Sequence, residues 1–420
     1  MSCHRQLITA AMVVDGAGVR AAPGALLLEG RSVVAAGSPQ AIGDAAGAAR
    51  LEMPGAIVMP ALVNAHAHLD LTHMPRIPFD GDFAAWIDRV RGGRAADDDA
   101  IEASVRRGIE LSLAGGTALI GDIGGAGSTV PLQVLRESPL GGVGFIEVFG
   151  IGSARQRGLA LIKRIVSEAV ADAGAVRLGL QPHAPYSCDG IVYEAARASG
   201  LPLCTHLAET PDEIEFTVRA TGPLADMLRS FGLWDESITA RRRHPIDDVC
   251  EVLGGVPLVA AHVNYLEDRH LKALAAASIT VAYCPRASAY FGHPRTRPHP
   301  RPRAAQPPHR YREMIDAGVN VALGTDGALC LDTPDRIGVL DEMRLLWRRD
   351  GTDPRMLLRM ATINGGQALG CDPSLVTFEL GPVAGVIAVD IDPHEPADPL
   401  VQALGHDRAP RWVIAPGPAV

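Results

Sequence analysis

The stretch AIVMPALVNAHAHLDL, residues 56–71, begins as an apolar run and ends with two histidines that one residue separates. Side chains two positions apart on a strand point to the same face of a sheet. His66 and His68 can therefore lie together where the sequence indicates that a buried strand ends. Such a pair suits a metal ion, although a histidine at a strand end is also common as an ordinary structural residue.

Apolar, β-branched runs alternate with helical stretches along most of the chain. We expect strands at residues 57–63, 117–123, 142–150, 176–182, 201–207, 257–263, 279–285 and 320–326. Helices are expected at residues 100–114, 155–172, 189–199, 267–277 and 335–348. Eight strands, each followed by a helix or a long crossover, predict an α/β fold, the (β/α)8 or TIM barrel.

Short strand-like segments stand at both ends of the chain, before the first barrel strand and after residue 371. Segments of this kind from the two termini can pair in one small unit. We therefore predict two domains. Residues 57–371 form the barrel, and residues 1–56 and 372–420 form a composite β-sandwich beside it.

Composition excludes several classes of protein. The 420 residues are 47% hydrophobic, which is ample for a large core, and no apolar run reaches the ~20 residues of a membrane span. A net charge of −9 disfavours nucleic-acid binding, so the basic clusters at Arg241–Arg243 and in the Pro/Arg-rich segment 294–308 are expected to be solvated loops. No signal peptide is apparent, and seven scattered cysteines indicate reduced thiols in a cytoplasmic protein.

Strong metal ligands and acids follow four of the predicted strands. Active sites of barrels form at the carboxyl ends of the strands, so these residues are expected to converge. They are His66 and His68 after the first strand, His206 and Glu209 after the fifth, His262 after the sixth and Asp326 after the eighth.

Three histidines and a carboxylate, in a site open to water, suit one Zn²⁺ or Fe²⁺ ion. Such an ion lowers the pKa of a bound water molecule to about 7. A carboxylated lysine would be needed to bridge two metals. The two lysines of the chain, Lys163 and Lys272, both lie in helical patterns. We therefore predict a single divalent metal.

Five segments carry a resemblance to the amidohydrolase superfamily, and in particular to its mononuclear deaminase and chlorohydrolase branch. They are MPALVNAHAHLDL (59–71), PHAPYSC (182–188), THLAET (205–210), AAHVNYL (260–266) and LGTDG (323–327). The resemblance runs over almost the whole chain, and together the motifs are highly specific for the superfamily. They are less specific for the substrate.

The resemblance implies the following metal ligands: His66, His68, His206 and Asp326. Asp326 is also expected to take the proton from the attacking water. Glu209 is expected to hydrogen-bond a ring nitrogen and to shuttle protons, His262 to steady the intermediate, and His183 to reach the substrate from the fourth strand. Gly327 stands where relatives commonly have serine, so one contact to the aspartate is missing.

Within the branch, residues 282–294 and 309–326 look most like aminodeoxyfutalosine deaminases, which remove the 6-amino group of an adenine nucleoside on a route to menaquinone. Further candidates for contact with the substrate are Trp86, Tyr290, Phe291, His293 and His309. Packing within the barrel wall or the loops is the alternative for each of them.

The expected function is a metal-dependent hydrolytic deaminase that acts on a small molecule, a 6-aminopurine nucleoside. One alternative is that the same site acts on another ring compound, such as adenosylhomocysteine, methylthioadenosine, guanine or a halogenated triazine. A second alternative is hydrolysis of a cyclic amide. A non-catalytic scaffold would have lost ligands, and all of them are present here. The resemblance also makes a homodimer plausible.

Overall fold

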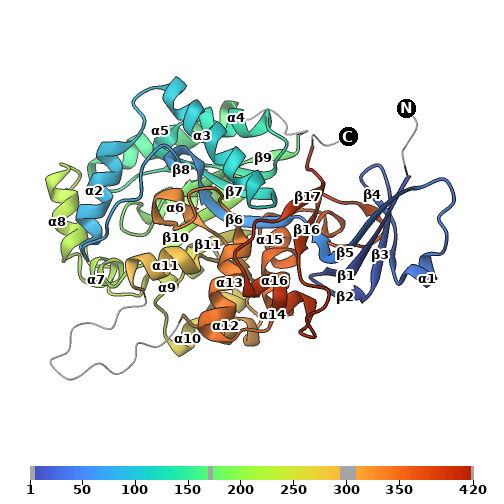
Figure 1. The fold of residues 1–420 in the computed structure, drawn as a ribbon. Coiled ribbons are helices and arrows are strands. Elements are labelled where there is room, and N and C mark those ends of the chain that lie inside the picture. Colours follow the sequence, from blue (N-terminus) through green and yellow to red (C-terminus); the bar gives the residue numbers. More distant parts are fainter. Residues whose placement is uncertain (1–4, 169–173, 294–308, 418–420) are drawn as a thin grey trace.

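The structure is a computed structural model that describes residues 5–168, 174–293 and 309–417. A barrel of strands and helices lies beside a second, smaller sheet that contains strands from both ends of the chain (Figure 1). The Pro/Arg-rich segment 294–308, which we expect to be a loop, lies outside the described residues.

The barrel confirms the fold class predicted from the sequence. Its parallel strands follow each other in chain order, and β13 pairs with β12 while β14 pairs with β6, so the sheet closes on itself. The strands are β6 (Leu62–His68), β7 (Thr117–Gly124), β8 (Gly141–Val148), β9 (Val176–Pro182), β10 (Leu203–Leu207), β11 (Leu258–His262), β12 (Ile279–Tyr283), β13 (Val321–Leu323) and β14 (Asp326–Gly327).

The predicted first strand, 57–63, has the wrong bounds. Residues up to Pro60 belong to the second sheet, where Met59 pairs with Ile387, and the barrel strand β6 begins only at Leu62. The change of sheet occurs at Ala61, whose N–H donates to the carbonyl of Gly385 at 2.8 Å. Both parts are buried and apolar, so hydrophobicity alone does not separate them.

The second sheet combines the two chain ends in the order β15-β4-β3-β1-β5-β16-β17, with β2 paired to β1. Its strands are β1 (Arg5–Asp15), β2 (Gly18–Ala21), β3 (Gly24–Glu29), β4 (Ser32–Gly37), β5 (Ala49–Pro60), β15 (Gly381–Pro382), β16 (Val386–Asp390) and β17 (Arg411–Ile414). Alternate residues of β5 face two cores: Ile57 and Met59 join that of the barrel, and Val58 that of the second sheet. Division of the chain into two domains at residues 56 and 372 stays a prediction.

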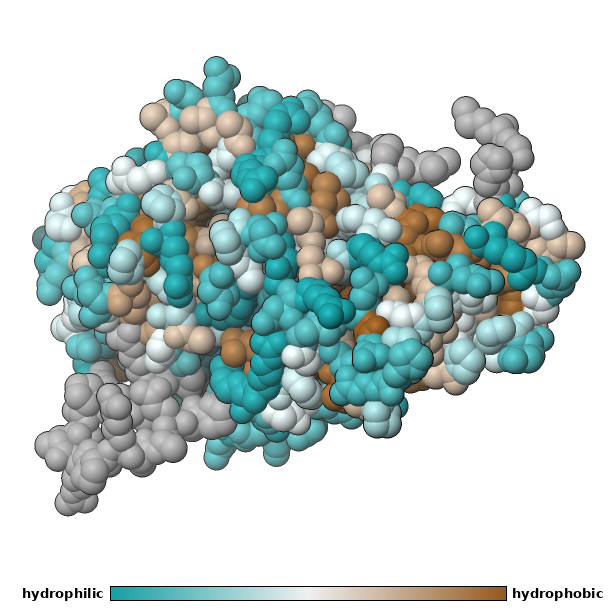
Figure 2. All heavy atoms as spheres, viewed as in Figure 1, coloured by the Kyte–Doolittle hydropathy of each residue, from teal (hydrophilic) through white to brown (hydrophobic). Residues whose placement is uncertain are grey.

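Helices surround the barrel, while α1 lies against the second sheet, and the surface seen in Figure 2 is mainly hydrophilic over the helices. They are α1 (Pro39–Ile42), α2 (Phe83–Gly93), α3 (Asp98–Ala114), α4 (Val130–Arg136), α5 (Arg155–Glu168), α6 (Gly190–Ala198), α7 (Pro211–Arg219), α8 (Pro223–Ser230), α9 (Pro245–Leu253), α10 (Asp268–Ala276), α11 (Pro285–Phe291), α12 (Tyr311–Asp316), α13 (Val339–Asp350), α14 (Pro354–Ala361), α15 (Ile363–Ala368) and α16 (Pro399–Gly405). Within the described residues, every helix is too short or too polar to span a lipid bilayer.

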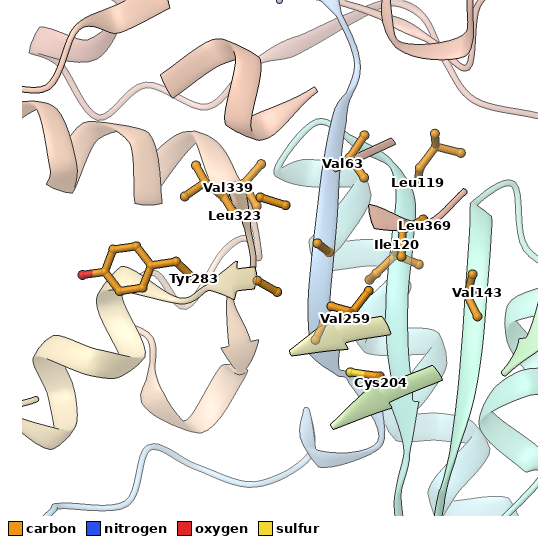
Figure 3. Close-up of a cluster of buried hydrophobic side chains, with 14 of the residues drawn as sticks. Val63, Leu119, Ile120, Val143, Cys204, Val259, Tyr283, Leu323, Val339 and Leu369 are labelled. Carbon is orange, nitrogen blue, oxygen red and sulfur yellow. The ribbon is translucent and has the colours of Figure 1, made fainter. Parts of the chain in front are cut away.

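The main core lies within and around the barrel sheet (Figure 3). Val63, Ile120 and Val259 come from three different strands, and Val339 comes from α13. Burial of such side chains is the dominant favourable contribution to folding and holds the strand ends in fixed positions.

Asp341 on α13 is shared by two buried arginines. Its carboxylate accepts hydrogen bonds from Arg344 Nη1 at 2.9 Å and from Arg336 Nε at 2.8 Å, and Arg344 also donates to the carbonyl of Arg408 at 2.6 Å. In Asp341→Ala two buried guanidinium groups lose their common partner. We expect the free energy of unfolding, measured by chemical denaturation, to fall by about 3–5 kcal/mol. An unchanged unfolding midpoint would contradict this role.

Candidate active site

Four histidines and one aspartate converge at the carboxyl ends of β6, β10 and β11 and at the start of β14, which follows β13. The Nε2 atoms of His68 and His206 are 3.3 Å apart, and His68 Nε2 is 3.5 Å from Asp326 Oδ1. His66 Nε2 lies 3.9 Å from the same oxygen, and the rings of His206 and His262 stack at 5.3 Å. The structure therefore brings together every metal ligand predicted from the sequence, with His262 beside them.

Two of these residues have a backbone conformation that side chains rarely adopt. The φ angles are 71° at His262 and 63° at Asp326. Asn64 helps to hold the eighth strand in place, since its amide donates to Thr325 Oγ1 at 2.8 Å and accepts from Thr325 N–H at 3.1 Å. The carboxylate of Asp326 accepts a hydrogen bond from the backbone N–H of Gly327. Unusual backbone angles of this kind gather at functional sites.

The donor set fits a divalent metal ion. His66, His68 and Asp326 each offer one atom within 4.8 Å of the others, and so do His66, His206 and His262. His66 Nε2 is buried without a hydrogen-bond partner among the described residues. Burial lowers the pKa of His66 and His68 well below the usual value, and that of His206 to about 3, so these rings keep a lone pair free for a ligand bond. Imidazole and carboxylate donors suit Zn²⁺ or Fe²⁺.

Neither lysine of the chain is positioned to act as a metal ligand. Lys163 on α5 and Lys272 on α10 both have exposed side chains. A lysine bridge between two metals is therefore not available in the described site, and a single ion stays a prediction.

Glu209 follows β10 and faces His262, with 3.7 Å between Glu209 Oε1 and His262 Nε2. Burial raises the pKa of Glu209 well above its usual range, which favours a neutral carboxyl that can donate a hydrogen bond. Its backbone is held from two sides. Glu213 on α7 accepts from the N–H groups of Ala208 at 2.8 Å and of Glu209 at 2.9 Å, and Asn264 donates to the Glu209 carbonyl at 3.1 Å.

Replacement of Glu213 by glutamine tests this support. The amide offers one acceptor where two N–H groups now bind a carboxylate, and Ala208 must keep its left-handed φ of 48°. One buried donor is then left without a partner, which costs about 1–3 kcal/mol. We expect a lower thermal midpoint and a turnover rate at least about 10-fold below wild type. Wild-type turnover would show that Glu213 does not position Glu209.

His183 follows β9 and lies beside the histidine cluster, with its ring 4.9 Å from that of His206. Its Nδ1 is 2.7 Å from Ser187 Oγ, and its Nε2 is 3.7 Å from Glu147 Oε1. Arg241 supports this loop by donating to the carbonyls of Pro185 and Cys188, both at 2.9 Å. At least one arginine of the 241–243 cluster thus has a structural role, where the sequence predicted only a solvated loop.

A cavity of about 500 Å³ opens over the cluster, a size typical of sites for small ligands. His68, His183, His206, Glu209, His262 and Asp326 line its floor. Its apolar wall includes Trp86, Phe149, Tyr186, Met227, Phe231 and Leu233. The lining of the cavity thus combines apolar side chains with the reactive groups of the cluster.

Two predicted substrate contacts are not at the cavity wall. Tyr290 lies behind Trp86, because its hydroxyl accepts from the Trp86 indole N–H at 3.0 Å and donates to the carbonyl of Ile77. His293 contacts the hydroxyl of Tyr265 through Nδ1 at 3.0 Å. Neither residue lines the cavity formed by the described residues, and substrate contact by Tyr290 and His293 stays a prediction.

The other two aromatic candidates also support the site from behind. Phe291 packs edge-on against Trp86 with ring centroids 4.8 Å apart. His309 donates from Nε2 to the carbonyl of His262 at 2.9 Å and stacks on Tyr283 at 3.7 Å. His309 thus helps to fix the unusual backbone of His262.

Four charged residues that line the cavity were not singled out from the sequence: Arg91, Arg94, Glu147 and Arg157. Arg94, which follows α2, donates to Asp70 Oδ2 at 2.7 Å and to Glu147 Oε2 at 3.4 Å. Glu147 stands near the end of β8, so the strand-end rule that identified the histidines could have found it. Arg94 comes from a loop, and nothing in the periodicity of the sequence marks it.

Comparisons with known proteins agree with this geometry. A 5-methylthioadenosine/S-adenosylhomocysteine deaminase from Moorella thermoacetica is 28% identical over 358 residues, which cover 80% of this chain and 74% of the relative. An aminodeoxyfutalosine deaminase from Deinococcus radiodurans is 29% identical over 403 residues, which cover 86% of this chain and 85% of the relative. The aminofutalosine deaminase of Helicobacter pylori has the same fold, with a TM-score of 0.77 at 18% identity over 99% of this chain and 100% of that one.

The sequence model of the amidohydrolase family matches residues 57–420, which include the whole barrel and every strand end of the site. The match and the converging ligands agree with the resemblance noted in the sequence. The chain belongs to the amidohydrolase family and is a hydrolase that acts on carbon–nitrogen bonds other than peptide bonds.

Proposed function

We propose that this amidohydrolase is a metal-dependent deaminase that removes the 6-amino group of a purine nucleoside, such as aminodeoxyfutalosine. The observation that carries the proposal is the position of Glu209. It stands beside the histidine and aspartate cluster on the floor of an apolar cavity, as a deaminase requires. The names of the two relatives, both deaminases of adenine nucleosides, support the same reaction.

The metal is proposed to be a single Zn²⁺ or Fe²⁺ ion held by His66, His68, His206 and Asp326. When bound, such an ion lowers the pKa of water to near 7 and so supplies the nucleophile. The clustered ring nitrogens and the unpartnered His66 Nε2 support this ligand set.

Different side chains of the site carry out the individual proton transfers. Water adds to the amino-bearing carbon, the new carbon–oxygen bond forms, and the carbon–nitrogen bond breaks to release ammonia. Glu209 donates a proton to the neighbouring ring nitrogen, and Asp326 takes a proton from the water and passes it to the departing amine. As the carbon–nitrogen bond breaks, the proton of the new hydroxyl returns to Glu209 and leaves a carbonyl on the ring. His262, 3.7 Å from Glu209 Oε1, stabilises the oxygen that develops on the ring carbon.

The apolar wall fits the flat face of a base. Trp86 and Phe149 line the cavity and offer aromatic surface for a purine. Substrate contact by Trp86 and His183 is part of this proposal.

The six described free cysteines fit the reducing cytoplasm predicted from the sequence. A homodimer stays a prediction.

A panel of substrates tests the proposal. Ammonia release is measured with aminodeoxyfutalosine, adenosine, adenosylhomocysteine, methylthioadenosine and guanine, while halide release is measured with a halogenated triazine and ring opening with a cyclic amide. We expect release from at least one 6-aminopurine nucleoside, with kcat/KM of about 10⁴ M⁻¹s⁻¹ or more for the preferred one. Turnover of the triazine or the cyclic amide alone would favour the other reaction classes and contradict the purine proposal.

A further inference from the structure

Glu147 is a buried carboxylate on the cavity wall to which the proposed reaction gives no part. Its side chain is 1% exposed, yet it lines the cavity beside His183. Both carboxylate oxygens can accept hydrogen bonds, but among the described residues only Oε2 accepts any. It accepts from Ala126 N–H at 2.8 Å and from Arg94 Nη2 at 3.4 Å.

The second oxygen, Oε1, accepts no hydrogen bond from any described residue. It lies 3.7 Å from His183 Nε2, too far for a hydrogen bond but close enough for one small donor to contact both atoms. Oε1 is not among the fully buried atoms that lack a partner, so solvent in the cavity reaches it and a donor of a ligand can replace that contact. A donor group of the ligand is therefore expected at this place.

The surrounding charges determine which kind of donor fits. Arg94 forms ion pairs with both Glu147 and Asp70. Two carboxylates therefore balance its positive charge, and it does not attract a further anion. The carboxylate is fixed by Arg94 and by a backbone N–H, so it does not turn away from the cavity. A neutral hydroxyl can donate to Oε1 without the desolvation cost of a second buried charge.

The position of Glu147 in the cavity indicates that this donor belongs to the sugar of a nucleoside. Glu147 is separated from the predicted metal ligand His206 by one side chain, that of His183. The sugar of a purine nucleoside is attached on the side of the base away from the 6-amino group. With the amino-bearing carbon at the cluster, a ribose hydroxyl lies farther along the wall.

We propose that Glu147 determines specificity by accepting a hydrogen bond from a hydroxyl of the substrate's ribose, with Arg94 and Asp70 as its positioning residues. The inference rests on the proposed function and adds a requirement for the sugar. The enzyme then prefers ribonucleosides to analogues that lack the contacted hydroxyl. Hydrogen bonds to charged groups are among the strongest in proteins, so we expect a preference of about 10- to 100-fold in kcat/KM.

The test compares wild type with Glu147→Gln and Glu147→Asp. The probes are adenosine, 2′-deoxyadenosine and 3′-deoxyadenosine, with the corresponding 5′-methylthio compounds as a second series. Glutamine keeps the shape and aspartate keeps the charge for Arg94, so at least one variant is expected to fold, as judged by its thermal midpoint. Glu194→Gln, an exposed change on α6, is the matched control.

Wild type and the control are expected to discriminate against one deoxy analogue, and the Glu147 variants to reduce that ratio to below about 3-fold. Calorimetry with inosine and its deoxy forms gives the same comparison without turnover. A wild-type ratio near one, or an unchanged ratio in both variants, would overturn this inference and leave the deaminase proposal intact. No ammonia from any purine nucleoside would instead overturn the proposed function, and this inference with it.

Discussion

Glu209→Gln is expected to lower kcat for ammonia release by about 10²- to 10⁴-fold, with metal content unchanged. The amide keeps the shape of the side chain and cannot cycle a proton to the ring nitrogen. Metal content is expected to stay the same because Glu209 lies outside the predicted ligand set, facing His262 at 3.7 Å. Steady-state kinetics and elemental analysis of the same preparation measure both quantities.

The control for this prediction is Glu194→Gln, which makes the same chemical change on an exposed face of α6. It is expected to keep wild-type kinetics. If Glu209→Gln retains more than about a tenth of the wild-type kcat, Glu209 is not the proton donor.

His206→Ala is expected to have the second large effect, on metal binding itself. Loss of a supporting partner of a ligand already costs 10- to 100-fold in metal affinity, so loss of the ligand is expected to cost more than about 100-fold. Activity is then expected to fall by at least about 10³-fold, since the metal supplies several kcal/mol of catalysis. Dialysis against a competing chelator, followed by elemental analysis, measures the retained metal.

His394→Ala is the matched control, because His394 is exposed and distant from the cluster in the sequence. The control is expected to retain metal and activity. Full metal occupancy in His206→Ala after dialysis would show that the ion is held elsewhere.

Side chains two residues apart on β6 point to the same face, and this repeat allowed the candidate site to be predicted from the sequence. His66 and His68 point to one face of the strand, and the first strong ligand after an apolar run marked His206, His262 and Asp326 in the same way. The barrel fold followed from the alternation of strands and helices. Closure of a parallel barrel then brings these strand ends to one mouth, whatever lies between them in the chain.

Other features depend on contacts that no local pattern records. Tyr290 follows a buried strand end as the clustered histidines do, but its hydroxyl contacts the indole N–H of Trp86 and it does not line the cavity. The change of sheet at Ala61 is set by a hydrogen bond to Gly385, which lies more than 300 positions away. Arg94 reaches the cavity from the loop after α2, and only the fold joins it to Glu147.

Titration of metal into metal-free protein tests the central claim most directly. The protein is stripped with a chelator, Zn²⁺ or Fe²⁺ is added in known amounts, and ammonia release from the preferred nucleoside is measured at each ratio. The account predicts that activity is absent without metal and rises linearly to a plateau at one ion per chain. Full activity in metal-free protein, or a plateau at two ions per chain, would contradict it.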